Sequence, residues 1–134
     1  MPATASESLP IHSADDVVVV RQRVRELALV LGFRLIDQTK LVTAASELAR
    51  NTLTHGRGGQ VEIVTLHDGS KKGLRLVFED QGPGIPDIAR ALTDGFTTGG
   101  GLGLGLGGSK RLCNEFSVES EPGRGTRVMI ARWA

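Results

Sequence analysis

The first half of the chain places apolar residues at the spacing of two amphipathic helices. The first helix is predicted from Asp15 and Asp16, which suit its N-cap and first turn, to about Leu31, where Gly32 stops it. Its predicted buried positions are Val17, Val20, Val24, Leu27, Ala28 and Leu31. The run of four valines near its start could instead open a strand, but the later spacing favours a helix.

The second helix is predicted to begin at Asp37, as its cap, and to extend to about His55, with Gly56 directly behind it. Its apolar positions are Leu41, Ala44, Ala45, Leu48 and Leu53. Because these positions recur every three or four residues, one face of this helix should be buried.

The pattern then changes to short apolar strands separated by turn residues. Strands are predicted over residues 60–67, 74–79, 116–119 and 126–133, with turns over 68–73 and 121–125. Residues 9–12 could form a short edge strand, and the small, polar residues 1–8 are expected to be frayed. Further short helices are predicted over residues 87–92 and from about Gly108 to Asn114.

This order of elements predicts an α/β (α+β) two-layer sandwich, with a mixed, mostly antiparallel sheet and helices on one face. At 134 residues, 40% of them apolar and 23% charged, the chain suits a single globular domain over residues 1–134. A net charge of +1 gives no basic footprint for nucleic acid. The single cysteine, Cys113, excludes an internal disulfide, and no apolar run approaches the ~20 residues of a membrane-spanning helix. A cytoplasmic protein without nucleic-acid or membrane partners is expected.

Residues 94–108 concentrate eight of the chain's 18 glycines, which alternate in part with leucines. Glycine lets a backbone approach a ligand closely, and phosphate is the usual ligand where a helix begins at the end of such a loop. A flexible linker is the alternative, although linkers lack regularly placed leucines. The order Ser109–Lys110 is the reverse of a Walker A loop, and no strand precedes the glycines as a dinucleotide-binding fold requires.

Glu47, Asn51 and His55 recur every four residues on the second predicted helix, so they share one face. An exposed polar stripe is the simplest interpretation, and one His, one Glu and an amide form a poor zinc site. A carboxylate and an amide suit Mg²⁺, which keeps several waters and takes further ligands from phosphate. His55 could line a phosphate site or interact with the carbonyls at the helix end.

Asp80, Gly82 and Gly84 follow a predicted strand in the sequence EDQGPGIPD. This could be an ordinary acidic turn. If Asp80 is partly buried, however, its carboxylate can accept the exocyclic amine hydrogen of adenine, and the glycines would let the ring approach the backbone. The turn Gly123–Thr126 would then offer the Thr126 hydroxyl to the base.

Together these segments resemble the nucleotide-binding domain shared by gyrase, a class of heat-shock chaperones, histidine kinases and MutL (the GHKL superfamily), which has the Bergerat-type ATP-binding fold. The matching motifs are Glu47–Asn51, Asp80-x-Gly82-x-Gly84, Gly99–Gly107 and Gly123–Thr126. The short chain is similar to anti-sigma-factor serine/threonine kinases. The strings ASELARN, EDQGPGIPD and DGFTTGGGLGLGLGGSKRL look closest to the RsbT-type switch kinases of stressosome modules.

The resemblance implies roles for individual residues. Glu47 would be the general base toward a serine or threonine hydroxyl, Asn51 would hold Mg²⁺ at the ATP phosphates, and Asp80 would bind adenine. The residues that would contact ATP, under a lid over 94–108, are Asn51, Asp80, Gly82, Gly84, Gly99, Gly100, Gly101, Leu102, Gly103, Leu104, Gly105, Leu106 and Thr126.

The resemblance also implies partners: a STAS-domain antagonist as the substrate, and a PPM-family serine phosphatase that the released kinase activates. Two other functions stay open from the sequence. One is an anti-sigma factor whose main act is to sequester a sigma factor. The other is a detached histidine-kinase module, or a family member that only hydrolyses ATP.

Overall fold

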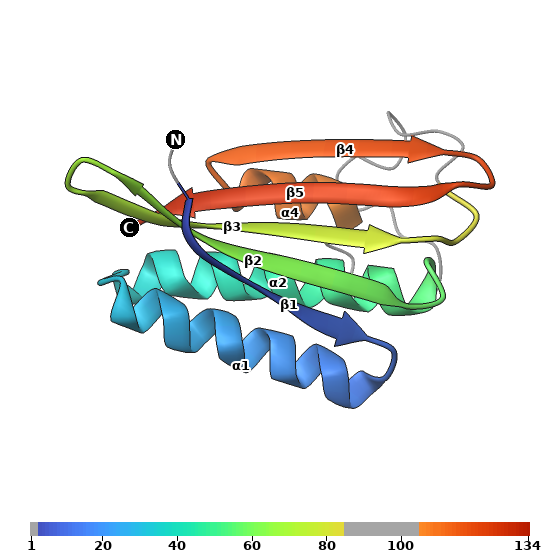
Figure 1. Ribbon diagram of the computed structural model, residues 1–134, viewed down its shortest axis with the longest axis horizontal. Helices are drawn as coiled ribbons and strands as arrows, with labels where there is room; N and C mark the ends of the chain where they lie inside the picture. The colour runs from blue at the N-terminus through green and yellow to red at the C-terminus, as the bar shows by residue number, and fades with distance from the viewer. Residues whose placement is uncertain (1–2, 85–104) are drawn as a thin grey trace.

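The computed structural model describes residues 3–84 and 105–134. Its elements are β1 (Ala3–Ile11), α1 (Ala14–Val30), α2 (Leu35–Thr54), β2 (Gly59–Asp68), β3 (Lys71–Asp80), α4 (Gly105–Arg111), β4 (Glu115–Glu121) and β5 (Gly125–Trp133) (Figure 1). The strands form one sheet in the order β1-β2-β3-β5-β4, and all neighbours are antiparallel. The helix predicted over 87–92 lies outside the described residues.

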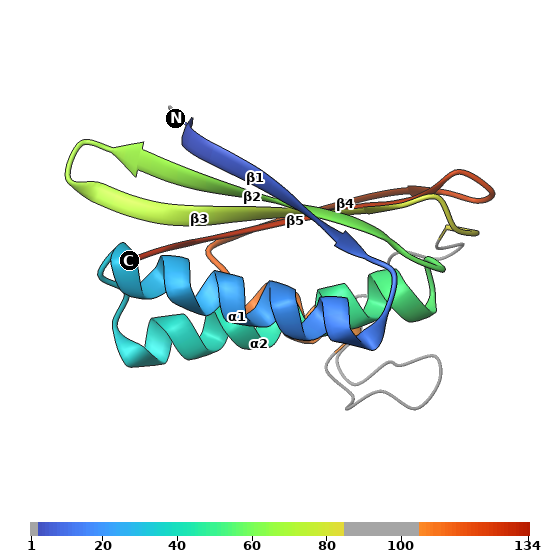
Figure 2. The ribbon, with the colours of Figure 1, turned by 60° about the horizontal axis from the view of Figure 1, so that its bottom comes forward.

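The helices are gathered on one face of the sheet. Figures 1 and 2 show α1 and α2 side by side below the strands, and α4 packs against α2. The predicted α/β two-layer architecture is therefore confirmed, with a sheet that is antiparallel throughout its described strands. No helix within residues 3–84 and 105–134 is both long and apolar enough to cross a membrane.

The core lies between the helices and the inner face of the sheet. The predicted helix faces supply Val17, Val20, Val24 and Ala28 from α1, and Leu41, Ala44, Ala45 and Leu48 from α2, all buried. Leu27, Leu31 and Leu53 are partly buried against this core, as their positions predicted. Because each fully buried Val or Leu side chain contributes about 1.5–3 kcal/mol, this layer accounts for the helices better than their intrinsic propensity does.

The ends of α1 follow from its capping residues. Ser13 is the N-cap, and its Oγ accepts a hydrogen bond from the Asp16 N–H at 3.3 Å, so Asp15 and Asp16 both lie in the first turn. Gly32 has φ +82°, the left-handed conformation that commonly ends a helix. The four-valine run is helical, as the later spacing indicated.

The prediction of a frayed N-terminus is wrong for residues 3–8, which belong to β1. This strand pairs with β2 from Ala3 to Ile11, whereas only residues 9–12 were expected to pair. Backbone pairing along an edge does not require apolar side chains. In addition, the Arg23 guanidinium on α1 donates to both oxygens of Glu7, with Nη2 at 2.8 Å and Nε at 2.9 Å, and so fastens the strand to the helix.

Asp37 does not cap α2, contrary to the prediction. The helix begins at Leu35, and Asp37 lies within its first turn. The Asp37 carboxylate instead accepts from Arg132 Nη2 at 2.6 Å, while Arg132 Nη1 donates to the Leu112 carbonyl at 2.8 Å. A long-range partner has replaced the local cap, and it ties α2 to β5 and to the segment that follows α4.

The helix predicted from Gly108 to Asn114 lies three residues nearer the N-terminus. Since α4 spans Gly105–Arg111, Gly107 and Gly108 are helical and buried. A glycine costs about 1 kcal/mol in a helix interior, so propensity alone favoured a later start. Packing against α2, with Leu106 only 7% exposed in the core, offsets that cost.

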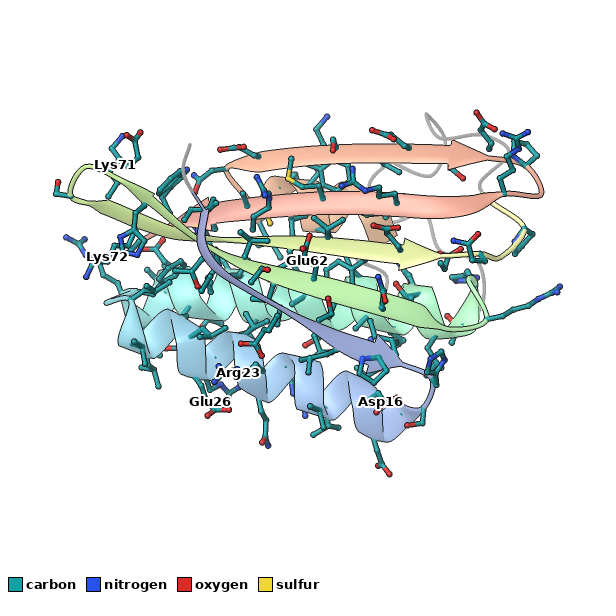
Figure 3. All side chains as sticks on the ribbon, in the orientation of Figure 1. Asp16, Arg23, Glu26, Glu62, Lys71 and Lys72 are labelled. Atoms are coloured by element: carbon teal, nitrogen blue, oxygen red, sulfur yellow. The ribbon has the colours of Figure 1, made fainter. Side chains whose placement is uncertain are left out.

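Exposed charges mark the end of the sheet farthest from Asp80. Figure 3 shows Lys71 and Lys72 at the tip of the β2–β3 hairpin, where both are exposed. In the same view Arg23 and Glu26 project together from α1, and their charged groups are 4.0 Å apart. The two lysines are solvated surface groups, and β3 runs from them to Asp80 at the opposite end.

Candidate functional site

The inner face of the sheet changes from apolar to polar at one end. The strand register places one row across β3, β5 and β4 that carries the polar side chains of Asp80, Thr126 and Ser120, with the bare backbone of Gly59 beside it on β2. The preceding row is apolar and belongs to the core: Val61, Phe78, Val128 and Val118. Because side chains alternate along a strand, Asp80 lies on the same face as Phe78, the face that the helices cover. The polar row therefore begins where the core ends.

Asp80 is half-buried and held from two sides. Its Oδ1 accepts a hydrogen bond from the Gly82 N–H at 2.9 Å. The bare backbone of Gly56, just behind α2, lies on the other side: a Cβ at Gly56 would be 2.5 Å from Asp80 Cβ and would collide with Cγ and Oδ2. A Cβ at Gly82 would in turn lie 2.8 Å from the Gly56 Cα. These glycines fix the carboxylate, and within the described residues only Oδ1 has a hydrogen-bond donor.

The loop behind Asp80 is braced by the β4–β5 turn. The Gly123 N–H donates to the Pro83 carbonyl at 2.8 Å. Gly84 has φ +80°, and a Cβ there would collide with the Glu121 carbonyl. At Gly84, which was predicted to contact the ligand, the backbone passes close to the backbone of Glu121. This contact sets the path of the chain as it leaves β3.

Thr126 lies directly opposite Asp80 in the antiparallel register. Side chains opposite one another on one face have Cβ atoms about 4.5–5.5 Å apart, so one small ligand group can contact both. Ser120 extends the row, with its Oγ 3.0 Å from Thr126 Oγ1. Gly125, before Thr126, has φ +98° and packs on the Asp80 carbonyl.

Glu47 is buried, which excludes the simple interpretation of an exposed polar stripe. It is 6% exposed, and its Oε1 accepts from Arg50 Nη1 at 2.7 Å. An isolated buried carboxylate is costly, so such a partner is needed. Asn51, one turn later, is half-buried. Its backbone carbonyl accepts hydrogen bonds from the backbone N–H groups of His55 and Gly56. His55 itself is the exposed C-cap of α2.

A hollow of about 530 Å³ lies beside Asp80. Its lining comes from the end of β1, the α2–β2 connection and the end of β3: His12, Gly56, Arg57, Gly58, Gly59, Gln60, Glu79, Asp80, Gln81 and Gly82. Its size falls in the range of small-molecule sites, roughly 300–1,000 Å³. Solvent and small ligands can therefore reach the Asp80 end of the sheet.

The predicted Mg²⁺ site has one suitable ligand on α2, the side chain of Asn51. The described ranges contain no group of three or more His, Cys, Asp and Glu side chains that could hold a metal ion. Mg²⁺ needs no such cage, because it keeps waters and binds one or two protein ligands together with phosphate oxygens. The half-buried Asn51 amide, one helical turn from Glu47, fits that minimal donor set.

Part of the predicted glycine-rich site lies outside the described residues: Gly99, Gly100, Gly101, Leu102, Gly103 and Leu104. Gly105 and Leu106 begin α4. The Leu106 side chain is buried in the core. Gly105 to Gly108, predicted as the end of the lid, are thus helical rather than loop.

A model of one protein family aligns with residues 36–133, which include every predicted site residue. It describes the histidine kinase-, DNA gyrase B- and HSP90-like ATPases. The chain belongs to this family. Its β3 end, with Asp80, and its α2 face, with Glu47 and Asn51, are the parts that the family resemblance had marked.

Two relatives show which proteins of this family the chain is similar to. The serine/threonine-protein kinase RsbT of Bacillus subtilis (strain 168) is 50% identical over 118 residues, covering 88% of this chain and 89% of that protein. The anti-sigma F factor of Thermoanaerobacter sp. (strain X514) is 33% identical over 97 residues, 68% of this chain and 66% of that protein. The predicted recognition is confirmed, and so is the assignment to the ATP-dependent kinases of this family.

Solved structures support the fold. The RsbU and RsbW domains of a Mycobacterium tuberculosis protein match with a TM-score of 0.66 at 19% identity, covering 96% of this chain and 32% of that one. The histidine kinase domain of a blue-light activated kinase from Erythrobacter litoralis matches with a TM-score of 0.56 at 20% identity, covering 98% of this chain and 65% of that one.

Sequence reasoning missed three residues of this site. Gly56 was interpreted only as a helix stop, although its N–H also bonds to the Asn51 carbonyl at 3.2 Å. Arg50 lies at i+3 from Glu47, a spacing that could have suggested the ion pair. Ser120 carries no signal in the sequence, because only the register of β4 with β5 brings it to Thr126.

Proposed function

We propose that the protein is a partner-switching serine/threonine kinase that transfers the γ-phosphate of ATP to a STAS-domain antagonist. After release from that partner it would bind and activate a PPM-family serine phosphatase. The observation that carries the proposal is the buried Glu47 carboxylate, one turn from Asn51 on the helix whose end contacts Asp80. The 50% identity to a serine/threonine-protein kinase over 88% of the chain supports the same class of chemistry.

Binding of ATP would use the Asp80 end of the sheet. The carboxylate held by Gly82 and Gly56 would accept a hydrogen from the adenine amine, and the Thr126 hydroxyl opposite would contact the ring directly or through water. A guanine ring carries a carbonyl oxygen in place of that amine, so it would face the Asp80 oxygen with an acceptor. Selection of ATP over GTP therefore follows from the charge of Asp80.

Transfer would use α2. The serine or threonine Oγ attacks the γ-phosphorus, its proton passes to Glu47 Oε2, and the bond to the β–γ bridging oxygen breaks to release ADP. Asn51 would hold Mg²⁺, which, when bound, neutralises charge on the phosphates. Positioning and charge neutralisation dominate phosphoryl transfer, so one general base and a few fixed ligands suffice.

An anti-sigma factor that sequesters a sigma factor is the second candidate, because anti-sigma F factors are 33% identical to this chain. The two functions differ in the fate of the partner. A kinase modifies its STAS partner and then loses affinity for it, since the new phosphate repels the nucleotide's negative charge. A sequestering protein instead keeps its sigma factor while nucleotide is bound.

The test combines phosphotransfer with capture. The full chain is incubated with labelled Mg-ATP and a panel of purified STAS-domain proteins and sigma factors from its own cell, and the modified residue is mapped. We expect one STAS protein to be phosphorylated and then to dissociate. Tight nucleotide-dependent capture of a sigma factor, with no STAS protein phosphorylated, would replace the proposal by its rival.

Variants of α2 separate binding from chemistry in the same assay. Glu47→Gln should keep ATP affinity and lower the transfer rate by about 10²–10⁴-fold, the usual effect of losing a general base. Asn51→Ala should weaken Mg-dependent ATP binding and abolish transfer while the fold survives. Equal loss of affinity and rate in Glu47→Gln would mean that this carboxylate is structural.

A further inference from the structure

Arg50 is a second charged residue beside the proposed base, and the sequence analysis assigned it no role. Its Nη1 donates to Glu47 Oε1 at 2.7 Å, and the two side chains are 37% and 7% exposed, respectively. The guanidinium therefore reaches from the surface of α2 to a buried carboxylate. Among residues 3–84 and 105–134, the Arg50 contact to Oε1 is the only hydrogen bond or ion pair of the Glu47 side chain, and Oε2 has no partner there.

The helix geometry places Arg50 on the opposite flank of Glu47 from Asn51. With about 100° of rotation per residue, Asn51 lies roughly 40° to one side of Glu47 and Arg50 roughly 60° to the other. Arg50 can therefore hold Oε1 without entering the side where Asn51 would bind the metal. The three residues form a continuous patch in the order Arg50, Glu47, Asn51 around the helix.

Stability alone gives a weak reason for this pair. Burying the Glu47 carboxylate costs hydration that offsets much of its attraction to the part-exposed Arg50, so the pair as a whole adds little, although removing Arg50 alone would leave a buried carboxylate unpaired. The pair does remove freedom from the carboxylate, since one oxygen is fixed by a short, charge-assisted bond. In a reaction that depends on position, a displacement of 1 Å can cost about 100-fold in rate.

We propose that Arg50 is a positioning residue for phosphoryl transfer: it anchors Glu47 through Oε1 and so presents Oε2 to the attacking hydroxyl. This inference rests on the proposed function, in which Glu47 is the general base. Arg50 acts only through Glu47, so it should govern the rate of the chemical step and leave ATP binding unchanged.

The test compares Arg50→Met, Arg50→Lys, Glu47→Gln and the double variant Glu47→Gln/Arg50→Met in the full chain. Turnover is followed as phosphate transferred to a STAS-domain protein and as phosphate released to water, since the same carboxylate can orient water. Arg25→Met is the matched control, because Arg25 is exposed on α1 and has no ion pair within the described residues. Thermal unfolding of each variant gives the folded fraction.

We expect Arg50→Met to lower kcat by about 10- to 100-fold with KM for ATP within twofold of the wild type. Arg50→Lys should restore part of the rate, because an ammonium can still bond one oxygen but lacks the rigid fork. In the Glu47→Gln background, Arg50→Met should change the rate little further, since the anchored group has gone. Arg25→Met should match the wild type.

The outcomes separate a failure of the Arg50 inference from a failure of the proposed kinase function. If Glu47→Gln slows turnover but Arg50→Met matches the wild type once the folded fraction is counted, the positioning role of Arg50 is refuted and the kinase assignment stands. Loss of thermal stability in Arg50→Met without a change in kcat would refute the positioning role in the same way. If Glu47→Gln leaves both readouts unchanged, Glu47 is not the base, and both inferences fall.

Discussion

Replacing Gly56 by alanine tests the nucleotide pocket at a position that no side chain now occupies. Gly56 does not adopt a positive φ, so its backbone would accept alanine if nothing lay opposite. The new Cβ, however, would lie 2.5 Å from Asp80 Cβ and would overlap Cγ and Oδ2. Carbon atoms in contact prefer about 3.5–4.0 Å, so the gap must open by about 1 Å. A rotation of the Asp80 side chain cannot relieve this, because its own Cβ is involved.

The size of the effect follows from the contacts that would be lost. Forcing an extra methyl group into a packed site typically costs about 1–3 kcal/mol of folding stability. Displacing Asp80 would also break the 2.9 Å bond from the Gly82 N–H and move the carboxylate away from the proposed adenine position. A hydrogen bond to a charged group contributes about 1.5–3 kcal/mol, which corresponds to roughly a 10- to 100-fold loss of ATP affinity.

Calorimetric titration with Mg-ATP and urea unfolding measure the two effects separately. Gly69→Ala is the matched control, because Gly69 lies in the distant β2–β3 turn at φ +62°, and a methyl group there would have no atom within 4 Å. It should lose stability through backbone strain, about 1–2 kcal/mol, and bind ATP normally. A folded Gly56→Ala variant with wild-type ATP affinity would refute the placement of adenine at Asp80.

Two further predictions concern titratable groups away from the pocket. The hydrogen bonds from Arg23 hold the pKa of Glu7 below its usual 4.5, so this carboxylate adds stability above that pH and loses it as the pH falls through the folded value. Urea unfolding should therefore find Glu7→Gln less stable than the wild type at pH 7, with a difference that narrows as the pH is lowered below 4.5, and a difference that does not change with pH would contradict the reasoning. Burial raises the pKa of the Cys113 thiol to about 11, so its alkylation by iodoacetamide at neutral pH should be much slower than that of a free cysteine. Rapid modification of the native protein would show that the thiol is not shielded.

The helices and the layers were predictable because their signals are local. Val20, Val24 and Ala28 are buried on α1, and Leu41 and Leu48 on α2, as the periodicity predicted. Each of these positions needs only to be apolar and correctly spaced. The strands were also placed correctly in order, although β2, β3, β4 and β5 each extend beyond the predicted range, because backbone pairing continues through polar residues and glycine.

The errors share one physical cause, which is a partner distant in the sequence. Asp37 has good capping chemistry, yet Arg132 near the end of the chain takes its carboxylate. Residues 3–8 look frayed in isolation, yet β2 and Arg23 hold them. Gly107 and Gly108 are poor helix formers, yet packing on α2 makes them helical. No pattern within a short window contains these partners.

The candidate site shows the same division between local and long-range information. The motifs around Glu47, Asn51 and Asp80 were recognisable because each is a short segment whose residue types and spacing resemble the family's. The contact between the Asn51 segment and the Asp80 segment was not recognisable from the sequence, because backbone atoms of Gly56 make it. The Asn51 carbonyl accepts the Gly56 N–H at 3.2 Å, and the Gly56 Cα region lies against the Asp80 carboxylate. The last turn of α2 therefore joins the proposed metal ligand to the proposed adenine acceptor with no intervening side chain. A shift of that turn would therefore move the proposed metal ligand and the proposed adenine acceptor together.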